Sequence, residues 1–421
     1  MDLDVAGGPV RATIPVPGSK SVANRALVCA ALADGESRLG GLPTGDDTEA
    51  MIDGLRRFGV PVEAVDRDRW SVHGRSIEGG VEIDARLAGT TSRFLTAVAA
   101  LGETSTTVSG GEALRRRPMG QLHDALRTLG ADVESLEHSG RLPVRVRRGD
   151  LQGGAVSMSG DVSSQFVSAL MLIGPCLPRG LEIRLTSPLV SRPYVAMTAS
   201  VMSDFGATGI VVADSMVSVE PSGYRGVDST IEPDASSASY PLAAAAVTGG
   251  RVRVPGLRRE SWQGDVAIVD ILGSMGCRVA FDDDGAEVEG GPLRGVDLDM
   301  SDVSDLVPTV AAVACFADSP TTITGVGFIR RKESDRIGDL VAGLNALGGR
   351  AVALDDGLRV EPSAALHGAR LSTHHDHRLA MVWSLMALRV PGVSIDDPTV
   401  VTKSWPAWWE VRSTLLASAI R

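Results

Sequence analysis

The sequence contains a repeated pattern with a period of about 70 residues. One series consists of apolar, helix-like runs, each preceded by a short polar segment: residues 26–32, 94–101, 166–173, 241–247, 307–316 and 379–388. A second series ends in a hydrophobic residue followed by glycine: Phe58-Gly59, Leu129-Gly130, Phe205-Gly206, Met275-Gly276 and Leu347-Gly348. Two interleaved series with one period indicate a single supersecondary unit that is used six times.

The two series predict two kinds of helix. Runs of the first series are apolar on nearly all faces, which is typical of helices buried inside a domain. The second series is amphipathic: Met51, Leu55 and Phe58 have the spacing of one helical face, and the glycine that follows suits a left-handed C-cap. Segments with high β-propensity lie between the helices, for example residues 11–16, 60–65, 278–281 and 322–324. Each unit is therefore predicted to be α/β, with strands wrapped around two helices.

The overall composition excludes several classes of function. A chain of 421 residues can form two or three domains. A net charge of −11 and an aromatic content of 4% argue against binding to nucleic acids or anionic membranes. Neither a signal peptide nor an apolar run of roughly 20 residues is visible. The cysteines lie far apart, as expected of reduced, mostly buried thiols in a cytoplasmic protein: Cys29, Cys176, Cys277 and Cys315.

The segment before the first apolar run predicts an anion site. Residues 17–21 (PGSKS) provide a glycine turn, hydroxyl groups and Lys20 at a helix start, and Arg25 follows. Helix N-termini that carry hydroxyls and cations bind phosphates or carboxylates. The segment is not a Walker A loop, because the earlier glycine of that motif is missing. The alternative is an ordinary capped helix start with solvated Lys20 and Arg25.

Two later helix starts in the first half have the same character. Gly89 and Arg93 belong to residues 87–93 (LAGTTSR), and residues 115–118 (RRRP) add cations, of which Arg117 abuts a helix-starting proline. Residues 163–165 (SSQ) offer two hydroxyls and an amide, suited to a phosphate and sugar-like hydroxyls, although serine before a helix is commonly a simple cap.

In the second half, Asp305 begins an apolar helix, where it either caps the helix or acts as a base. Residues 331–336 (RKESDR) form either a solvated surface or an acid–base group beside an anion. Residues 374–378 (HHDHR) do not predict a metal site, because contiguous histidines cannot all ligate one ion and no H-x-x-x-H or cysteine cluster supplies remote partners. Lys403 lies at the start of the last helix.

These motifs, in this order, resemble those of the 5-enolpyruvylshikimate-3-phosphate synthases, which belong to the enolpyruvyl transferases. The resemblance covers essentially the full length. The matching segments are residues 17–25 (PGSKSVANR), 88–93 (AGTTSR), 117–120 (RPMG), 163–166 (SSQF), 191–194 (SRPY), 234–240 (DASSASY), 332–336 (KESDR), 376–381 (DHRLAM) and 402–403 (TK).

The resemblance implies an α/β fold of two lobes. Each lobe would hold three βαβαββ repeats, with helix N-termini facing the cleft between the lobes. One lobe would span residues 15–228, and the other would combine residues 1–14 and 229–421. The implied reaction transfers the enolpyruvyl group of phosphoenolpyruvate to the 5-hydroxyl of shikimate 3-phosphate and releases phosphate. The resemblance also implies a monomer that needs no metal or cofactor.

The resemblance also implies the site residues. Asp305 would be the base at the 5-hydroxyl, Glu333 would handle the proton at the methylene carbon, and Lys20 would share in proton transfer. The residues implied for shikimate 3-phosphate are Lys20, Ser21, Arg25, Ser163, Ser164, Gln165, Ser191, Tyr194, Asp305 and Lys332. Those implied for phosphoenolpyruvate are Lys20, Gly89, Arg93, Arg117, Gln165, Arg336, His377, Arg378 and Lys403.

Three positions depart from the pattern of many family members: Leu87, Phe94 and Phe328. They leave details of hydroxyl recognition and of inhibitor response near Gly89 open. One alternative is the related transferase that acts on UDP-N-acetylglucosamine, but residues 111–120 lack the reactive cysteine expected there. A second is an inactive, anion-binding homologue, which would be expected to lose the carboxylates of Asp305 and Glu333.

Overall fold

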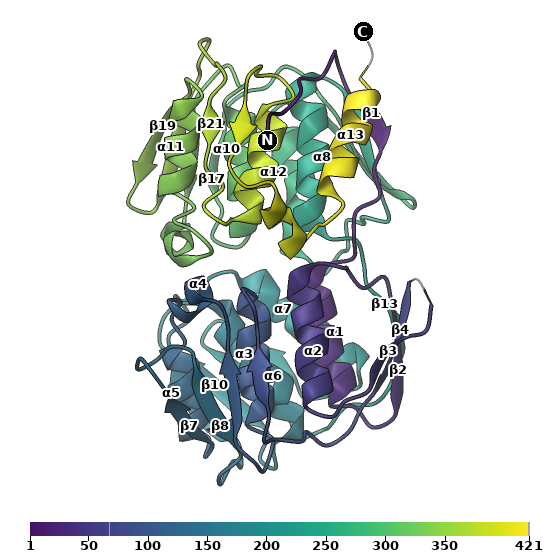
Figure 1. Ribbon diagram of the computed structural model, residues 1–421, viewed down its shortest axis with the longest axis vertical. Helices are drawn as coiled ribbons and strands as arrows, with labels where there is room; N and C mark the ends of the chain where they lie inside the picture. Colours follow the sequence, from purple (N-terminus) through teal and green to yellow (C-terminus); the bar gives the residue numbers. More distant parts are fainter. Residues whose placement is uncertain (67, 420–421) are drawn as a thin grey trace. The chain divides into compact units, whose positions relative to one another are not determined.

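A computed structural model describes residues 1–66 and 68–419. The chain forms two compact units, which Figure 1 shows. We call Gly18–Ile231 lobe A, and Met1–Pro17 together with Glu232–Arg421 lobe B. The boundaries fall after Pro17 and Ile231, close to residues 14 and 228, where the resemblance implies them.

Lobe A consists of three repeats. Its strands are β2 (Glu36–Gly40), β3 (Val62–Ala64), β4 (Arg69–His73), β5 (Glu82–Asp84), β6 (Thr106–Ser109), β7 (Asp132–Ser135), β8 (Val144–Arg147), β9 (Gly154–Met158), β10 (Leu181–Leu185), β11 (Val211–Val212), β12 (Met216–Val219) and β13 (Asp228–Thr230). Its helices are α1 (Lys20–Ala31), α2 (Asp46–Arg57), α3 (Gly89–Ala99), α4 (Glu112–Arg115), α5 (Gly120–Thr128), α6 (Ser164–Ile173), the 3₁₀ helix η1 (Gly174–Cys176) and α7 (Arg192–Asp204).

The three sheets of lobe A share one topology. Their strand orders are β13-β2-β4-β3, β5-β6-β8-β7 and β9-β10-β12-β11. In each sheet the first two strands are parallel and the remaining pairings are antiparallel. In the sheets β5-β6-β8-β7 and β9-β10-β12-β11, a helix (α3 or α6) connects the two parallel strands, as parallel pairing requires, and each sheet with its two long helices is one βαβαββ unit. In the remaining sheet the strand parallel to β2 is β13, which comes from the end of the lobe and completes the unit of α1, β2, α2, β3 and β4.

Lobe B repeats this plan with one reduced unit. Its strands are β1 (Arg11–Thr13), β14 (Arg251–Pro255), β15 (Arg278–Asp282), β16 (Gly285–Glu289), β17 (Asp297–Asp299), β18 (Thr321–Thr324), β19 (Arg350–Leu354), β20 (Gly357–Glu361), β21 (Arg370–Leu371) and β22 (Ser394–Ile395). Its helices are α8 (Ala235–Thr248), η2 (Gly264–Ala267), α9 (Ile268–Ser274), η3 (Ser304–Leu306), α10 (Val307–Ala314), η4 (Gly327–Arg331), α11 (Gly338–Ala346), α12 (His377–Met386), η5 (Thr399–Lys403) and α13 (Trp408–Ala417).

Two sheets of lobe B have four strands, in the orders β1-β14-β16-β15 and β17-β18-β20-β19, whereas the last sheet is the parallel pair β21-β22. The N-terminal residues complete this pair from the other side. The backbone N–H of Ile395 donates to the Met1 carbonyl at 2.9 Å, and that of Leu3 donates to the Val393 carbonyl at 3.0 Å. The predicted α/β fold of six repeats is confirmed, with the sixth sheet reduced.

The predicted division into buried and amphipathic helices is also confirmed. Nearly all residues of the central helices are buried: α1, α3 and α6 in lobe A, and α8, α10 and α12 in lobe B. Within each lobe these three helices contact one another, and the sheets and the other helices lie around them (Figure 1). None of the helices in the described part of the chain has both the length and the apolarity needed to cross a membrane.

Side chains at the helix ends account for where the helices begin and stop. Ser19, Ser163, Asp234 and Asp376 each cap a central helix by accepting a backbone N–H. The glycines that follow the amphipathic helices have φ of 83°, 108°, 86°, 107° and 78°, at Gly59, Gly130, Gly206, Gly276 and Gly348. A non-glycine residue would be strained at such angles, so the predicted left-handed C-caps are confirmed.

The cysteines agree with the sequence prediction. All four are free thiols, and Cys29, Cys277 and Cys315 are buried while Cys176 is half-buried. Burial raises the pKa of all four thiols, that of Cys176 to about 11, which keeps them protonated and poorly reactive at neutral pH.

His123 of α5 is a buried titratable group outside the central helices. Its side chain is 0% exposed, and its Nδ1 lies 3.3 Å from the Ser135 hydroxyl. Burial lowers the pKa of His123 from 6.5 to about 4, and the nearby Arg127 adds to this effect. At pH 6, His123 is therefore neutral in the folded protein, whereas in the unfolded chain its imidazole is mostly protonated.

We predict that His123 makes the protein sensitive to mild acid. Because its folded pKa is below its unfolded pKa, the stability it contributes is complete above pH 6.5 and is lost as the pH falls towards 4. The full shift corresponds to about 3 kcal/mol. The free energy of unfolding, measured with urea between pH 7.5 and 4.5, should fall less steeply in His123→Asn than in the wild type. The exposed His138 provides the control His138→Asn, and equal slopes for His123→Asn and the wild type would contradict the prediction.

Candidate functional site

The N-terminal turns of the central helices of lobe A lie together. The Arg25 guanidinium of α1 lies 5.3 Å from the centroid of the Phe94 ring in α3. The Arg93 guanidinium of α3 in turn lies 5.4 Å from the centroid of the Phe166 ring in α6. All four residues belong to the first two turns of their helices. The repeat therefore brings three predicted anion-binding segments to one end of the central helices.

Lys20 is the first residue of α1, and its charge is paired. Its Nζ donates to Oδ2 of Asp47 at 2.9 Å, with side-chain exposures of 19% for Lys20 and 5% for Asp47. The Asp47 carbonyl accepts a hydrogen bond from the Thr91 hydroxyl of α3 at 2.9 Å. Sequence analysis did not identify Asp47, although two adjacent aspartates at the start of a helix provide a signal. The contact holds the Lys20 ammonium at the junction of α1, α2 and α3.

Arg25 is 1% exposed, so the alternative of a solvated arginine is wrong. Its Nε donates to the Thr198 hydroxyl at 2.7 Å, and its Nη1 donates to the Ser21 carbonyl at 2.7 Å. Its Nη2 donates to the Tyr194 carbonyl at 3.2 Å and to the Ser168 hydroxyl at 3.3 Å. Burial lowers the pKa of Arg25 to about 10, which leaves it cationic at neutral pH. Arg25 thus joins the start of α1 to α6 and α7.

Gly89 lies between two guanidinium groups. The Arg93 Nη1 donates to the Gly89 carbonyl at 2.8 Å. A Cβ atom built on Gly89 would lie 2.7 Å from Nη1 of both Arg93 and Arg117. Two cations this close repel each other unless an anion screens them, and the start of α3 adds the N–H groups that favour an anion. The arrangement is suited to a phosphate or carboxylate.

The starts of α6 and α7 present polar groups of lobe A. Ser163 caps α6 by accepting from the Gln165 N–H at 3.3 Å, and Ser164 is 6% exposed. The Oε1 atom of Gln165 is buried and has no hydrogen-bond partner among the described residues, so it is suited to accept from a ligand hydroxyl. Ser191, directly before α7, has a φ of 53°, a strained angle for a side-chain-bearing residue.

In lobe B, three cations converge on one carboxylate. Oδ1 of Asp305 accepts from Lys332 Nζ at 3.1 Å and from Arg336 Nη1 at 2.9 Å. Its Oδ2 accepts from Arg378 Nη2 at 2.8 Å. Asp305 lies inside η3, whose N-cap is Val303, and the N-cap of the following helix α10 is Leu306. The interpretation of Asp305 as a helix cap is therefore wrong, because it does not occupy the N-cap position of either helix.

This surrounding charge sets the proton affinity of Asp305. Burial would raise the pKa of the carboxyl, but the three cations outweigh burial and hold the pKa well below its usual range. Burial lowers the pKa of Lys332, and the carboxylate of Asp305 opposes that change. The ion pairs are shielded, since the Asp305 side chain is 17% exposed and that of Arg336 is 2% exposed.

Arg336 links Asp305 to two further carboxylates. It is 1% exposed; its Nη2 donates to Glu333 Oε2 at 2.7 Å, and its Nε donates to Asp376 Oδ2 at 2.7 Å. Asp376 is 0% exposed and also caps α12 by accepting from the Arg378 N–H at 2.9 Å. Burial alone would lower the pKa of Arg336, but its carboxylate partners raise it. We call Asp305, Lys332, Glu333, Arg336, Asp376 and Arg378 the Asp305 cluster.

Sequence analysis missed Asp376 as a site residue, although an aspartate just before a His-Arg helix start is a usable signal.

Two other predicted residues of lobe B are buried. His377 is 2% exposed, and its Nδ1 lies 3.6 Å from Asp376 Oδ1. Lys403 is 6% exposed and ends η5, which packs on α12. Within residues 1–66 and 68–419, no group of three or more His, Cys, Asp or Glu side chains is placed to hold a metal ion.

Two of the three departures from the family pattern contact candidate site cations. Phe94 provides the ring under Arg25, and the Phe328 ring centroid lies 5.8 Å from Lys332 Nζ. An aromatic face stabilises a nearby cation, so both phenylalanines support residues of the predicted site. Leu87 is 43% exposed.

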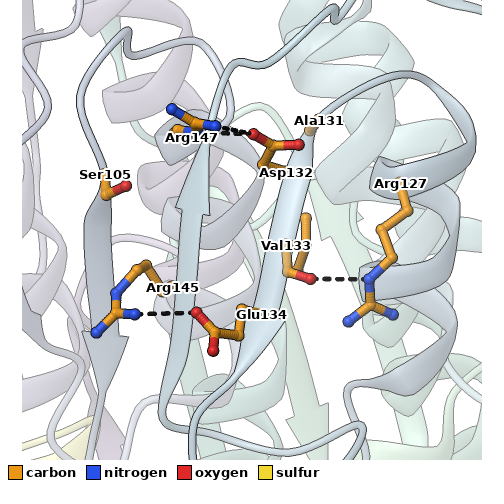
Figure 2. Close-up of a pocket in the computed structure, with 8 residues that line it drawn as sticks. All are labelled: Ser105, Arg127, Ala131, Asp132, Val133, Glu134, Arg145 and Arg147. Carbon is orange, nitrogen blue, oxygen red and sulfur yellow. Dashed lines mark hydrogen bonds and ion pairs between the residues drawn. The ribbon is translucent and has the colours of Figure 1, made fainter.

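A surface pocket in lobe A lies elsewhere. It is formed over the sheet β5-β6-β8-β7 and the neighbouring α5, and Figure 2 shows that two of its arginines pair with carboxylates while a third bonds a backbone carbonyl. Arg147 pairs with Asp132, Arg145 pairs with Glu134, and Arg127 Nε donates to the Val133 carbonyl at 2.8 Å. No predicted site residue lines this pocket.

Comparisons with known proteins identify the family. The family model described as EPSP synthase (3-phosphoshikimate 1-carboxyvinyltransferase) matches residues 5–411. A protein named 3-phosphoshikimate 1-carboxyvinyltransferase from Nostoc punctiforme is 40% identical over 421 residues, covering 97% of each chain. One of the same name from Methanoculleus marisnigri is 42% identical over 409 residues, covering 96% of each chain.

The fold agrees with this match. A solved structure of EPSP synthase from Acinetobacter baumannii aligns with a TM-score of 0.83 at 24% identity, over 98% of this chain and 97% of that chain. A second structure from the same organism aligns with a TM-score of 0.82 at 23% identity. With a family model that matches nearly its whole length and relatives at about 40% identity, the chain belongs to the EPSP synthase (3-phosphoshikimate 1-carboxyvinyltransferase) family.

Proposed function

We propose that the protein transfers the enolpyruvyl group of phosphoenolpyruvate to the 5-hydroxyl of shikimate 3-phosphate and releases phosphate. This is the shikimate-pathway step towards chorismate and the aromatic amino acids. The observation that carries the proposal is the convergence of Lys332, Arg336 and Arg378 on the shielded carboxylate of Asp305. A reaction between two anions that also moves protons needs cations and carboxylates held together in this way.

We assign the two substrates to the residues predicted from the sequence. Arg93 and Arg117, on either side of Gly89, are suited to the phosphate of phosphoenolpyruvate, and Arg336 and Arg378 are suited to its carboxylate. Lys20, Gln165, His377 and Lys403 complete that set. The set for shikimate 3-phosphate is Lys20, Ser21, Arg25, Ser163, Ser164, Gln165, Ser191, Tyr194, Asp305 and Lys332.

The proposed chemistry is an addition followed by an elimination. Glu333, with Lys20 sharing in proton transfer, protonates the methylene carbon of phosphoenolpyruvate, and positive character develops on the neighbouring carbon. The 5-hydroxyl oxygen bonds to that carbon while Asp305 takes the hydroxyl proton. The bond from that carbon to the phosphate oxygen then breaks and phosphate leaves. Glu333 takes back a proton from the methyl group, which restores the double bond.

The ion pairs explain how Asp305 changes from a weak base to a stronger one. With Lys332, Arg336 and Arg378 on its oxygens, its pKa lies well below the usual range, so it holds a proton poorly. When the carboxylate of phosphoenolpyruvate binds Arg336 and Arg378, the negative charge of the substrate offsets theirs. The pKa of Asp305 rises as a result, and the base is activated only when substrate is present.

The alternative functions are less well supported. The relatives at 40% and 42% identity are both named as acting on 3-phosphoshikimate, which disfavours the transferase specific for UDP-N-acetylglucosamine. An inactive homologue is disfavoured because Lys20, Asp305 and Glu333 are all present. We further propose that the protein is a cytoplasmic monomer; light scattering after gel filtration would test the monomer, and cell fractionation would test the location.

Phosphate release should require both substrates. Purified protein mixed with shikimate 3-phosphate and phosphoenolpyruvate should release one phosphate for each enol ether formed, measured colorimetrically and by mass spectrometry. Omitting either substrate should abolish release, because neither half-reaction is complete alone. Release with UDP-N-acetylglucosamine in place of shikimate 3-phosphate would overturn the substrate assignment.

Asp305→Asn should lower kcat by on the order of 10²- to 10⁴-fold, which is the usual contribution of a positioned general base. The amide keeps the shape but cannot take the hydroxyl proton. Shikimate 3-phosphate affinity, measured by calorimetry, should change far less. The matched control is Asp270→Asn, which removes an exposed carboxylate of lobe B paired with Arg259 at 3.0 Å. Near-normal turnover in Asp305→Asn would exclude the assigned role.

Gly89→Ala should raise the KM for phosphoenolpyruvate about tenfold, equivalent to about 1.4 kcal/mol. The new methyl group would meet Nη1 of Arg93 and Arg117 at 2.7 Å and displace both cations. The KM for shikimate 3-phosphate should change little. Gly7→Ala is the control, because no heavy atom lies within 4 Å of a Cβ atom built there. An unchanged KM for phosphoenolpyruvate would show that the two arginines do not hold this substrate.

A further inference from the structure

Asp265 is a buried carboxylate outside the assigned site. Its hydrogen-bond partner Ser236 belongs to the motif at residues 234–240, and this motif has no role in the proposed reaction. Asp265 lies in η2 and is 3% exposed. Its Oδ2 accepts a hydrogen bond from the Ser236 hydroxyl in the first turn of α8. Gln263 fixes the same segment: its Oε1 accepts from the Ala235 N–H at 2.9 Å, and its Nε2 donates to the Pro233 carbonyl at 2.8 Å. Asp265 therefore has little freedom to move.

The elements that carry Asp265 and Asp305 pack on the same helix. Both η2 and η3 contact α8. The Ser239 hydroxyl of α8 lies 3.0 Å from the Thr309 hydroxyl of α10, the helix that follows η3. Burial raises the pKa of Asp265 to about 6, and the negative charge of Asp305 is the largest contribution from another charged group. The two carboxylates are thus within electrostatic reach of each other.

We propose that Asp265 is a positioning residue whose negative charge increases the basicity of Asp305. The inference rests on the proposed function, in which Asp305 takes the proton of the 5-hydroxyl. Three cations favour the ionised form of Asp305 and so weaken it as a base. A second carboxylate nearby disfavours that ionised form, because like charges raise each other's proton affinity.

The effect of Asp265 depends on pH. With a pKa of about 6, Asp265 is largely ionised at pH 7.5 and becomes neutral as the pH falls below 6. The Ser236 hydroxyl and Arg378 favour its ionised form, whereas burial and Asp305 oppose it. The charged groups that act on the two carboxylates are Asp234 at the N-cap of α8, Lys332, Glu333 and Arg336 before α11, and Arg378 in the first turn of α12.

Two substitutions in this contact should move the pH profile of kcat in opposite directions. Asp265→Asn keeps an acceptor for Ser236 but removes the charge, so Asp305 becomes a weaker base. We expect kcat at pH 7.5 to fall about fivefold. The decline of kcat on the acid side of its pH profile should move to lower pH. Ser236→Ala keeps the carboxylate but removes the hydrogen bond that favours its ionised form. Asp265 then becomes neutral at higher pH, and the acid-side decline should move to higher pH.

The experiment measures kcat from pH 5 to 9 with both substrates saturating, together with both KM values and the thermal midpoint of each variant. Asp270→Asn is the control and should keep the wild-type profile. Two results with an active wild type would overturn this inference alone. Either the acid-side decline of kcat stays at the same pH in Asp265→Asn, or it moves in the same direction in both variants. If Asp265→Asn does not fold, an acid-side decline unmoved in Ser236→Ala would overturn it. A wild type that releases no phosphate would overturn the proposed function as well.

Discussion

The structure depends on burying the central helices of each lobe almost completely. A helix that is apolar on all sides presents only its ends to a ligand, so the polar side chains of these helices gather in the first turns of α1, α3 and α6 in lobe A and at the starts of α10 and α12 in lobe B. The N–H groups at these ends favour anions. The repeat places such ends together within each lobe, which produces several segments suited to anions from one structural unit.

Burying cations at these ends requires compensation inside each lobe. Arg25 is satisfied by carbonyl and hydroxyl groups, whereas Lys20 and Arg336 are satisfied by carboxylates. A cation held by a carboxylate can turn to an anionic substrate, and the proton affinity of the carboxylate it leaves then rises, whereas carbonyl partners carry no charge that could respond in this way. In the proposed reaction the Asp305 cluster would therefore couple substrate binding to acid–base chemistry, while Arg25 connects the helices.

Much of the fold was predictable because each repeat carries its own local signals. The glycines after the amphipathic helices adopt the left-handed conformation that the sequence predicted, since only local sterics decide it. The reduced sixth sheet was not predictable, because residues 1–3 pair with a strand almost 400 residues away in the sequence. Asp305 could not be distinguished from a cap, because its cations come from two other segments of the chain. Asp265 was missed for the same reason, since its partner Ser236 lies in another segment, whereas Asp47 and Asp376 were missed although each lies at a helix start.

The sequence by itself determined the period, the two kinds of helix and the residue types at each helix start, since these follow from local hydrophobicity and turn chemistry. The motifs in their order also pointed to the family that the comparisons identified. Only the tertiary structure decided which charges meet. Ion pairing depends on distances between segments that are far apart in the sequence. The charges of these neighbouring side chains, rather than the residue type, decide whether a carboxyl such as that of Asp305 holds its proton tightly or weakly.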